Sequence, residues 1–338
     1  MHPDSTNSFP AERIFNLHSD QFEPAALDLF RFQYANNSLY QRYCRAIRKS
    51  PGEINGLADI PFLPISFFKT NEVISTNFTP ALVFESSGTT GSVNSKHFVK
   101  NASLYEESFL RGFRLVYGEI TDYCILGLLP SYLERQHSSL VYMTERLIRE
   151  SGNPDSGFYL YDFEKLQETI LRNESTSQKT ILLGVTYALL DFAEKYPMQL
   201  SHTIVMETGG MKGRGPELTR PEVHERCKQR FGINEVHSEY GMTELLSQAY
   251  APGNGIFSCP PWMKVIARAE DDPFDLQVPG SFSKEKLTSA VNIIDLANIY
   301  SCAFIATDDA ATFYNDGRYE ILGRLDNSDL RGCSLLIV

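Results

Sequence analysis

The sequence predicts an α/β fold with mainly parallel sheets, flanking helices and a smaller β-rich subdomain. From Ala81 onward, short apolar runs alternate with longer amphipathic segments, which is the order of strands and helices around a parallel sheet. Beyond Ala249 the runs become shorter and are separated by the turn sequences APGNG, CPPW and VPGS, which indicates a β-rich part. The first sixty residues carry apolar side chains at helical spacing, as at Leu39, Tyr43 and Ile47.

Each element follows from its local pattern. After the N-terminal helices, the segment IPFLPISFF is a turn region punctuated by proline. Buried strands are expected at the apolar runs ALVFE, YCILGLL, GFYLY, TILLGV and HTIVME, with helices between them at residues 102–116, 138–150, 162–172, 186–195 and 219–231. We therefore expect three parts: a helical segment packed on the main domain (1–80), an α/β core (81–249) and a β-rich subdomain (250–338). Loops at the carboxyl ends of the strands should form the site.

Composition narrows the class of protein. The 338 residues carry a net charge of −11, and a protein that binds nucleic acid along its backbone needs a basic face instead. No apolar run reaches the about 20 residues of a membrane span, and the N-terminal sequence lacks the apolar stretch of a signal peptide. The six cysteines are scattered without a C-x-x-C pair, which argues against a zinc site or a disulfide framework. We expect a cytoplasmic protein with reduced thiols.

A loop rich in glycine and hydroxyl groups directly follows ALVFE, in the stretch VFESSGTTGSVNSKH. Successive backbone N–H groups in such a turn can converge on an anion. The residues concerned are Ser86, Ser87, Gly88, Thr89, Thr90 and Gly91, with Lys96 close behind as a point charge. The loop is neither a Walker A motif nor a nucleophile elbow, because G-K-[ST] and G-x-S-x-G are absent. The alternative reading is a flexible surface linker.

Further motifs make the sequence resemble a known superfamily. S-S-G-T-T-G is similar to the phosphate loop of adenylate-forming enzymes, and four later segments match that superfamily in order: ETGGMKGR (207–214), YGMTE (240–244), ATDD (306–309) and DGRYEILGRLDNSDLRG (316–332). The short chain, the segment YLERQHSSL and a cysteine near the carboxyl end most resemble the LuxE-type acyl-protein synthetases, or fatty acid–protein ligases.

The resemblance implies roles for individual residues. It implies that Ser86 to Gly91 cradle the β- and γ-phosphates of ATP, that Thr243 contacts the α-phosphate and that Glu244 holds Mg²⁺. It also implies that Gly209, Gly210, Tyr240 and Gly241 lie near the adenine, and that Asp309 binds the ribose with Arg324 nearby. The alternative readings are the first acidic residue of a helix for Glu244, a core aromatic for Tyr240 and a solvated turn for Asp308 and Asp309.

Two further residues are assigned by the resemblance. His137, which follows LLPSYLERQ, is implied to lie at the acyl site, although a lone loop histidine is more often a surface residue. Cys333 is implied to accept the acyl group as a thioester, and Arg331 could lower the pKa of its thiol. The alternative is a buried strand residue, since CSLLIV is apolar.

The chain also departs from the superfamily. It ends six residues after Gly332, so we expect the mobile carboxyl-terminal domain and its catalytic lysine to be absent. Extra residues precede Lys96, Asp329 stands where a basic residue is usual, and T-D-D replaces T-G-D. A partner could supply the missing charge, or the enzyme could be slow alone.

Three hypotheses for function follow. The first is an ATP- and Mg²⁺-dependent ligase that converts a carboxylic acid, such as a fatty acid, to acyl-AMP. The acyl group then passes to a cysteine thiol and on to an acceptor such as an acyl reductase. The second is an acyltransferase that works from a preformed thioester without ATP. The third is a non-catalytic subunit that binds a nucleotide or an acyl group. The acidic residue in Y-G-M-T-E favours the first, because passive binding has little need of a metal ligand there.

Overall fold

The computed structural model describes residues 9–86, 93–129, 137–209 and 218–325. Contacts divide the chain into two compact units. The first combines Met1–Phe78 with Pro261–Val338, and the second is Thr79–Pro260. The second unit is therefore inserted, in sequence, between the two segments of the first. The three-part division 1–80, 81–249 and 250–338 stays a prediction. None of the described helices is long and apolar enough to cross a bilayer.

The unit formed by the two ends of the chain combines short helices with an antiparallel sheet. Its strands lie in the order β15-β14-β13-β11-β12, and β1 pairs with β14 in parallel. The helices are α1 (Phe22–Asn36), α2 (Ser38–Ala46) and α3 (Phe67–Thr70). The strands are β1 (Leu63–Pro64), β11 (Met263–Arg268), β12 (Leu276–Gln277), β13 (Lys286–Asp295), β14 (Phe304–Tyr314) and β15 (Tyr319–Arg324). The expected β-rich character of the chain's end is confirmed.

Helix α1 is held to the end of the chain by one buried amide. Gln33 is 0% exposed; its Nε2 donates to the carbonyls of Asn298 and Ile299 at 2.9 Å each, and its Oε1 accepts from the N–H of Ala303 at 3.0 Å. A buried amide left unpaired would cost free energy, so this set of bonds fixes the helix at one place. The N-terminal helices thus belong to the same compact unit as the β-rich end of the chain.

The unit of residues 79–260 has the expected α/β architecture. Its six-stranded sheet has the order β5-β4-β6-β7-β8-β9, with parallel pairs except for β8 and β9. The strands are β4 (Cys124–Leu128), β5 (Gly157–Phe158), β6 (Thr180–Val185), β7 (Thr203–Thr208), β8 (His237–Tyr240) and β9 (Ala249–Ala251). The helices are α4 (Ala102–Tyr117), α5 (Ser139–Ser151), α6 (Phe163–Ser175), α7 (Thr186–Lys195) and α8 (Arg220–Phe231). Each lies within a few residues of its predicted span.

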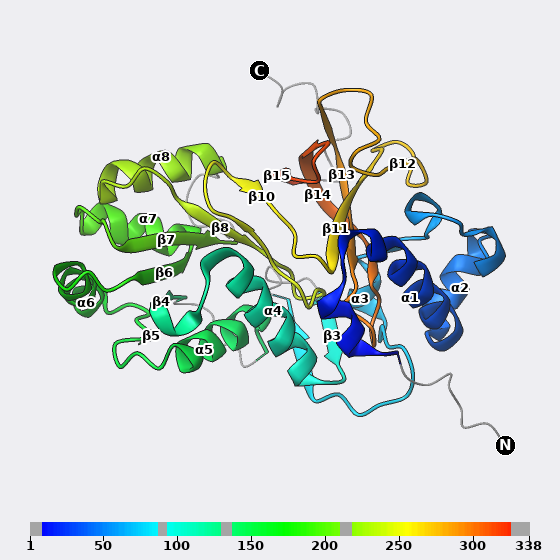
Figure 1. Cartoon of the computed structure of the whole chain (residues 1–338), viewed down its shortest axis with the longest axis horizontal. Helices are drawn as coiled ribbons and strands as arrows, with labels where there is room; N and C mark the ends of the chain where they lie inside the picture. Colours follow the sequence, from blue (N-terminus) through cyan, green and yellow to red (C-terminus); the bar gives the residue numbers. More distant parts are fainter. Residues whose placement is uncertain (1–8, 87–92, 130–136, 210–217, 326–338) are drawn as a thin grey trace. The chain divides into compact units, whose positions relative to one another are not determined.

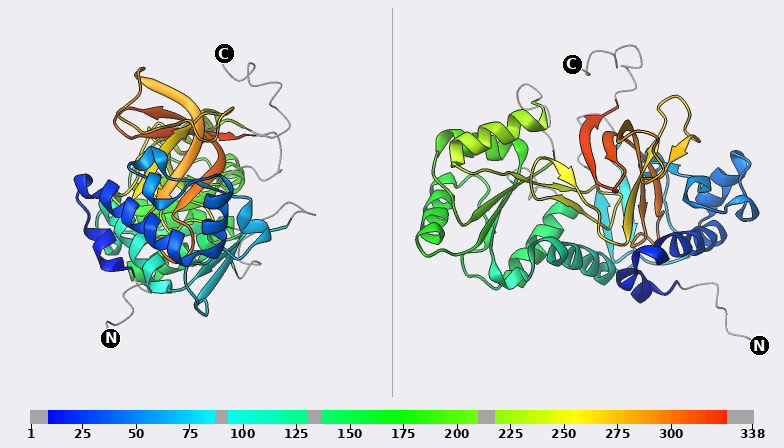
Figure 2. Two further views of the ribbon diagram at one scale, coloured as in Figure 1. Left: turned by 90° about the vertical axis from the view of Figure 1, so that its right-hand side faces the viewer. Right: turned by 45° about the horizontal axis from the view of Figure 1, so that its top comes forward.

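Helices cover both faces of this sheet. The core on one face contains Leu182 and Val205 from the strands, Ile170 of α6, Phe192 of α7 and Phe231 of α8. Helices α4 and α5 lie on the opposite side (Figure 1; Figure 2, right). A strand that is buried on both faces reads as a continuous apolar run, which is why β4 and β6 were recognisable in the sequence.

Two strand predictions were wrong in part. ALVFE gives β2 (Leu82–Glu85), which pairs antiparallel with β3 (Lys96–Val99) in a separate two-stranded sheet and is not part of the parallel sheet. Its side chains are mostly half-buried, so it packs as a hairpin. GFYLY gives a strand of only two residues, β5, because Leu160 has a positive φ of 47° that ends the extended run.

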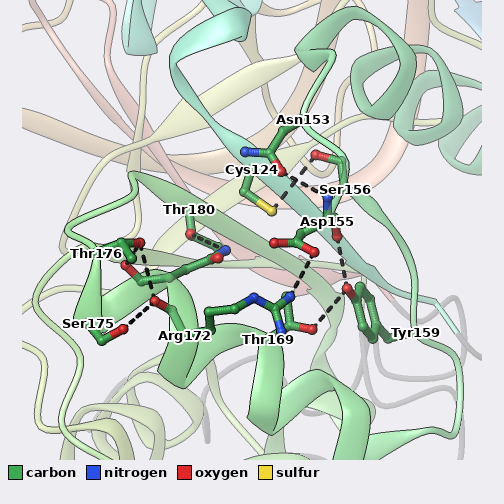
Figure 3. Close-up of polar contacts among 11 residues, drawn as sticks. Cys124, Asn153, Asp155, Ser156, Tyr159, Thr169, Arg172, Ser175, Thr176 and Thr180 are labelled. Carbon is green, nitrogen blue, oxygen red and sulfur yellow. Dashed lines mark hydrogen bonds and ion pairs between the residues drawn. The ribbon is translucent and has the colours of Figure 1, made fainter.

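A polar network closes the amino end of the six-stranded sheet (Figure 3). Ser156 Oγ lies 3.9 Å from Cys124 Sγ, and Asn173 Nδ2 donates to Thr180 Oγ1 at 3.1 Å. Tyr159 Oη lies 2.8 Å from the carbonyl oxygen of Asp155. Cys124 is fully buried, and burial raises the pKa of its thiol, so the thiol stays protonated and inert. None of the five described cysteines forms a disulfide.

Candidate active site

The base of the glycine and hydroxyl loop is a closed hairpin. Strands β2 and β3 pair Glu85 with Lys96, and Ser86 N–H donates to the Ser95 carbonyl at 3.0 Å. Ser95 N–H donates in turn to Ser86 Oγ at 2.8 Å. Lys96 Nζ lies 3.4 Å from Glu85 Oε1, and its side chain is 53% exposed. The two ends of the loop are hydrogen-bonded to each other, so the hairpin that carries the loop is not a flexible linker. Residues 87–92 of the loop itself lie outside the described residues.

The Y-G-M-T-E segment forms a turn after β8. Tyr240 is the last residue of β8, 9% exposed, with its ring centroid 5.8 Å from that of Phe257. Glu244 lies in a turn and is 5% exposed. The alternative that made Glu244 the first acidic residue of a helix was wrong, because the chain runs from β8 to β9 without a helix. A carboxylate held out of water needs a compensating partner.

The loop base and the turn after β8 are in contact. His97 follows Lys96 in β3; its Nδ1 lies 2.8 Å from the carbonyl oxygen of Thr243, and it is 1% exposed. His137 meets the same hairpin, since Glu85 N–H donates to the His137 carbonyl at 2.8 Å. The side chain of His137 is exposed. Three segments that are distant in sequence are thus joined at the loop base.

The carboxyl end of β7 carries a buried ion-pair network. Glu207 is 5% exposed; Arg220 Nε donates to its Oε1 at 2.9 Å, and His224 Nε2 lies 3.7 Å from the same oxygen. Burial raises the pKa of Glu207, but hydrogen bonding to His224 and the Arg220 charge outweigh it, so the pKa is lowered overall. Glu207 is therefore a buried carboxylate that stays charged.

Gly209 follows β7 at the same end of the sheet. Thr186 Oγ1 donates to the carbonyl of Gly209 at 2.6 Å, and Gly209 has a φ of 67°, a conformation that favours glycine. The backbone of the Gly-Gly segment is thereby fixed at its first residue. Gly210 lies outside the described residues.

The pKa of Glu239, on the other face of the sheet, is shifted in the opposite direction to that of Glu207. It is 7% exposed and accepts a hydrogen bond from Thr208 Oγ1 at 2.5 Å. Its pKa is raised to about 7, mainly by burial. The hydrogen bond from Thr208 lowers this pKa, and the nearby charge of Glu207 raises it. The register pairs Thr208 with Glu239 and Glu207 with Ser238, so the two acids occupy opposite faces with opposite pKa shifts.

The remaining predicted residues belong to the other unit. Asp309 pairs with Arg324 across β14 and β15, and Arg324 Nε lies 3.9 Å from Asp309 Oδ1. The solvated-turn reading of Asp308 and Asp309 was wrong, because both lie inside strand β14. Cys333 lies outside the described residues.

The described residues fit Mg²⁺ only as a site completed by a bound substrate. No cluster of three or more His, Cys, Asp or Glu side chains that could hold a metal occurs among them. Magnesium is commonly held by one or two carboxylates together with substrate phosphates and water. Glu244, a buried acid next to Thr243, matches that pattern.

The sequence analysis missed three residues of this site: His97, Glu207 and Glu239. Each had a signal, because each is a polar residue at or near the end of an extended run. His97 stands beside Lys96, Glu207 ends HTIVME, and Glu239 directly precedes Tyr240.

Comparison with known proteins identifies the family. The family model described as acyl-protein synthetase, LuxE, matches residues 7–338. The chain therefore belongs to the LuxE acyl-protein synthetase family. Comparison with curated proteins gives no significant match.

Several solved structures are similar to the chain. One is an O-succinylbenzoate coenzyme A synthetase from Bacillus subtilis in complex with AMP, at 16% identity and a TM-score of 0.48, covering 74% of this chain and 50% of that one. Another is a long-chain-fatty-acid-CoA ligase from Archaeoglobus fulgidus, at 15% identity and a TM-score of 0.48, covering 73% and 52%. A third is a luciferase-like enzyme from the mealworm Zophobas morio, at 15% identity and a TM-score of 0.44, covering 75% and 60%. The chain spans about half the length of the first two.

Proposed function

We propose that the chain activates a carboxylic acid with ATP and Mg²⁺ and passes the acyl group to a cysteine thiol. A carboxylate oxygen attacks the α-phosphorus, the bond from that phosphorus to the bridging oxygen breaks, and pyrophosphate leaves. The thiolate then attacks the acyl carbon of acyl-AMP, and AMP leaves. Both partners of the first step are anions, so positioning and positive potential supply most of the catalysis.

One observation carries this proposal: the base of the glycine and hydroxyl loop and the Y-G-M-T-E turn are joined by the 2.8 Å contact between His97 and Thr243. The loop from Ser86 to Gly91 would cradle the β- and γ-phosphates, with Lys96 as a cation beside it. Thr243 would contact the α-phosphate. Glu244 would hold Mg²⁺, which supplies charge neutralisation of the phosphates when bound. LuxE family membership supports the acyl transfer.

We also propose roles for the residues around the nucleoside and the acyl group. Gly209, Gly210, Tyr240 and Gly241 would surround the adenine. Asp309 would accept hydrogen bonds from the ribose hydroxyls beside Arg324, and His137 would lie at the acyl site. Cys333 would carry the thioester and deliver the acyl group to an acceptor such as an acyl reductase, and a fatty acid is the proposed substrate. We propose a cytoplasmic location.

The test uses the full chain with ATP, Mg²⁺ and a panel of carboxylic acids, followed by intact mass measurement and release by hydroxylamine. We expect an ATP-dependent acyl adduct that hydroxylamine removes and that is absent in Cys333→Ser. An adduct that persists in Cys333→Ser would contradict the acceptor assignment. An adduct that forms from an acyl thioester without ATP would favour the acyltransferase, and nucleotide binding without turnover would favour the non-catalytic subunit.

A further inference from the structure

His97 is placed by the hairpin that carries the glycine and hydroxyl loop. It pairs with Phe84 across β2 and β3, two residues after Ser95 closes the loop base. Side chains alternate between the two sides of a strand. Lys96 is therefore exposed while His97 is turned inward and is 1% exposed.

The hydrogen bond between His97 and Thr243 has a defined donor and acceptor. Its Nδ1 lies 2.8 Å from the carbonyl oxygen of Thr243, 146 positions away in the sequence. A carbonyl oxygen can only accept a hydrogen bond, so Nδ1 must carry the proton and donate it. This bond forms in the Nδ1–H tautomer and also in the doubly protonated imidazolium.

The accepting carbonyl is part of the peptide that leads to Glu244. Because a peptide group is planar, fixing the Thr243 carbonyl also fixes the direction of the Glu244 N–H and the position of the Glu244 Cα. The segment between β8 and β9, all of it described, has no helix or strand of its own. One turn bond, from Leu245 N–H to the Met242 carbonyl at 3.2 Å, spans this peptide. An irregular segment depends on such bonds for its geometry.

We propose that His97 is a positioning residue that fixes the Thr243–Glu244 peptide against the base of the phosphate loop. The inference rests on the proposed function of that loop and turn. His97 itself touches neither phosphate nor metal in this account. Its bond joins the base of that loop to the peptide of the residue that would hold Mg²⁺.

Three substitutions in the full chain separate this role from simple burial. In His97→Asn the amide nitrogen takes the place of Nδ1 and can still donate to the Thr243 carbonyl. In His97→Gln the amide reaches the place of Nε2, and in His97→Ala no donor remains. An error of about 1 Å in the position of catalytic groups can cost about 100-fold in rate.

We expect His97→Ala and His97→Gln to lose about 10- to 100-fold in kcat for acid-dependent pyrophosphate–ATP exchange. The KM for the acid should stay unchanged, and a higher Mg²⁺ concentration should be needed for half-maximal rate. His97→Asn should restore most of the rate. Titration of Mn²⁺ in the presence of ATP, followed by electron paramagnetic resonance, should show the same order of affinities without relying on turnover.

His237→Ala is the matched control. This imidazole lies in the same unit, and its Nδ1 is 3.2 Å from Tyr117 Oη, outside the phosphate loop and the turn. We expect unchanged exchange per folded molecule.

The outcomes separate the two proposals. Equal kcat, equal metal dependence and equal Mn²⁺ affinity in the Asn, Gln and unmodified chains would overturn the role of His97, even if His97→Ala fails to fold. Absence of exchange in the unmodified chain would contradict the proposed function instead, and the order of Mn²⁺ affinities would still decide for or against the positioning role.

Discussion

Buried polar groups occur at both ends of the six-stranded sheet, and the two ends use them differently. At the amino end, Asn173 donates to Thr180 and Ser156 donates to Cys124. The ion pair between Arg172 and Asp155, at 2.7 Å, is partly exposed, with side chains 53% and 35% accessible. Neutral groups are thus paired inside and the charges remain in water, which is the arrangement that costs least.

The carboxyl end buries charge. Glu207 remains ionised with a lowered pKa, whereas Glu239 has its pKa raised to about 7. Near Glu239, the buried atoms Gln248 Oε1 and Tyr250 Oη have no hydrogen-bond partner within the described part of the chain. Unpaired buried polar atoms are costly to folding, and perturbed pKa values concentrate at functional sites. The amino end therefore has the features of a structural network, and the carboxyl end has those typical of functional sites.

The largest change in stability is expected from Glu239→Gln at the carboxyl end. The raised pKa means that the folded state binds more protons than the unfolded state between about pH 4.5 and pH 7. The contribution of Glu239 is therefore fully present below its unfolded pKa and is lost as pH rises through about 7.

Glu239→Gln removes this titration. We expect its free energy of unfolding at pH 8 to exceed that of the unmodified chain by on the order of 3 kcal/mol, with little difference at pH 4.5. Urea titrations at several pH values measure this. Parallel pH profiles for the two proteins would contradict the assignment of the raised pKa to Glu239.

A smaller effect is expected from Gly241→Ala. A Cβ at this position would lie 2.6 Å from Glu239 Oε1, so the carboxyl group, whose other oxygen accepts from Thr208, would have to shift. Overpacking of this kind costs about 1–3 kcal/mol, and acid-dependent exchange should fall with it.

Gly157→Ala is the control for that substitution at β5. A Cβ there meets nothing within 4 Å, so stability and exchange should stay close to those of the unmodified chain. Equal effects of the two substitutions would show that the close approach at Gly241 is relieved without cost.

The smallest effect is expected from Arg172→Gln at the amino end. Its partner Asp155 raises the pKa of the Arg172 guanidinium, but both side chains are substantially exposed, and water and salt screen such pairs. Thermal unfolding should change little, and any difference should vanish in 1 M salt, where screening is strong. A large, salt-independent loss would mean that the amino-end network depends on this charge.

The helices and buried strands could be predicted from local pattern alone. The predicted span 186–195 coincides with α7, and TILLGV coincides with β6, because amphipathic and fully apolar periods are encoded residue by residue. The motifs around Thr243, Glu244 and Asp309 came instead from the resemblance to adenylate-forming enzymes.

What could not be predicted depends on partners distant in sequence. ALVFE is as apolar as the core strands, yet within the described parts of the chain β2 pairs only with β3. The His97–Thr243 bond joins residues 146 positions apart, and the opposite pKa shifts of Glu207 and Glu239 follow from the register that turns them to opposite faces. No local pattern contains this information.

The central claim is that the phosphate loop and the Y-G-M-T-E turn form the site that activates the acid. The most direct measurement is acid-dependent pyrophosphate–ATP exchange in the unmodified chain, in Glu244→Gln and in Cys124→Ala. We predict exchange in the unmodified chain, a loss of at least about 100-fold in Glu244→Gln, and near-normal exchange in Cys124→Ala despite a stability loss of about 1–2 kcal/mol from the vacated core volume. Exchange that survives in Glu244→Gln, or that is lost equally in Cys124→Ala at the same folded fraction, would contradict the claim.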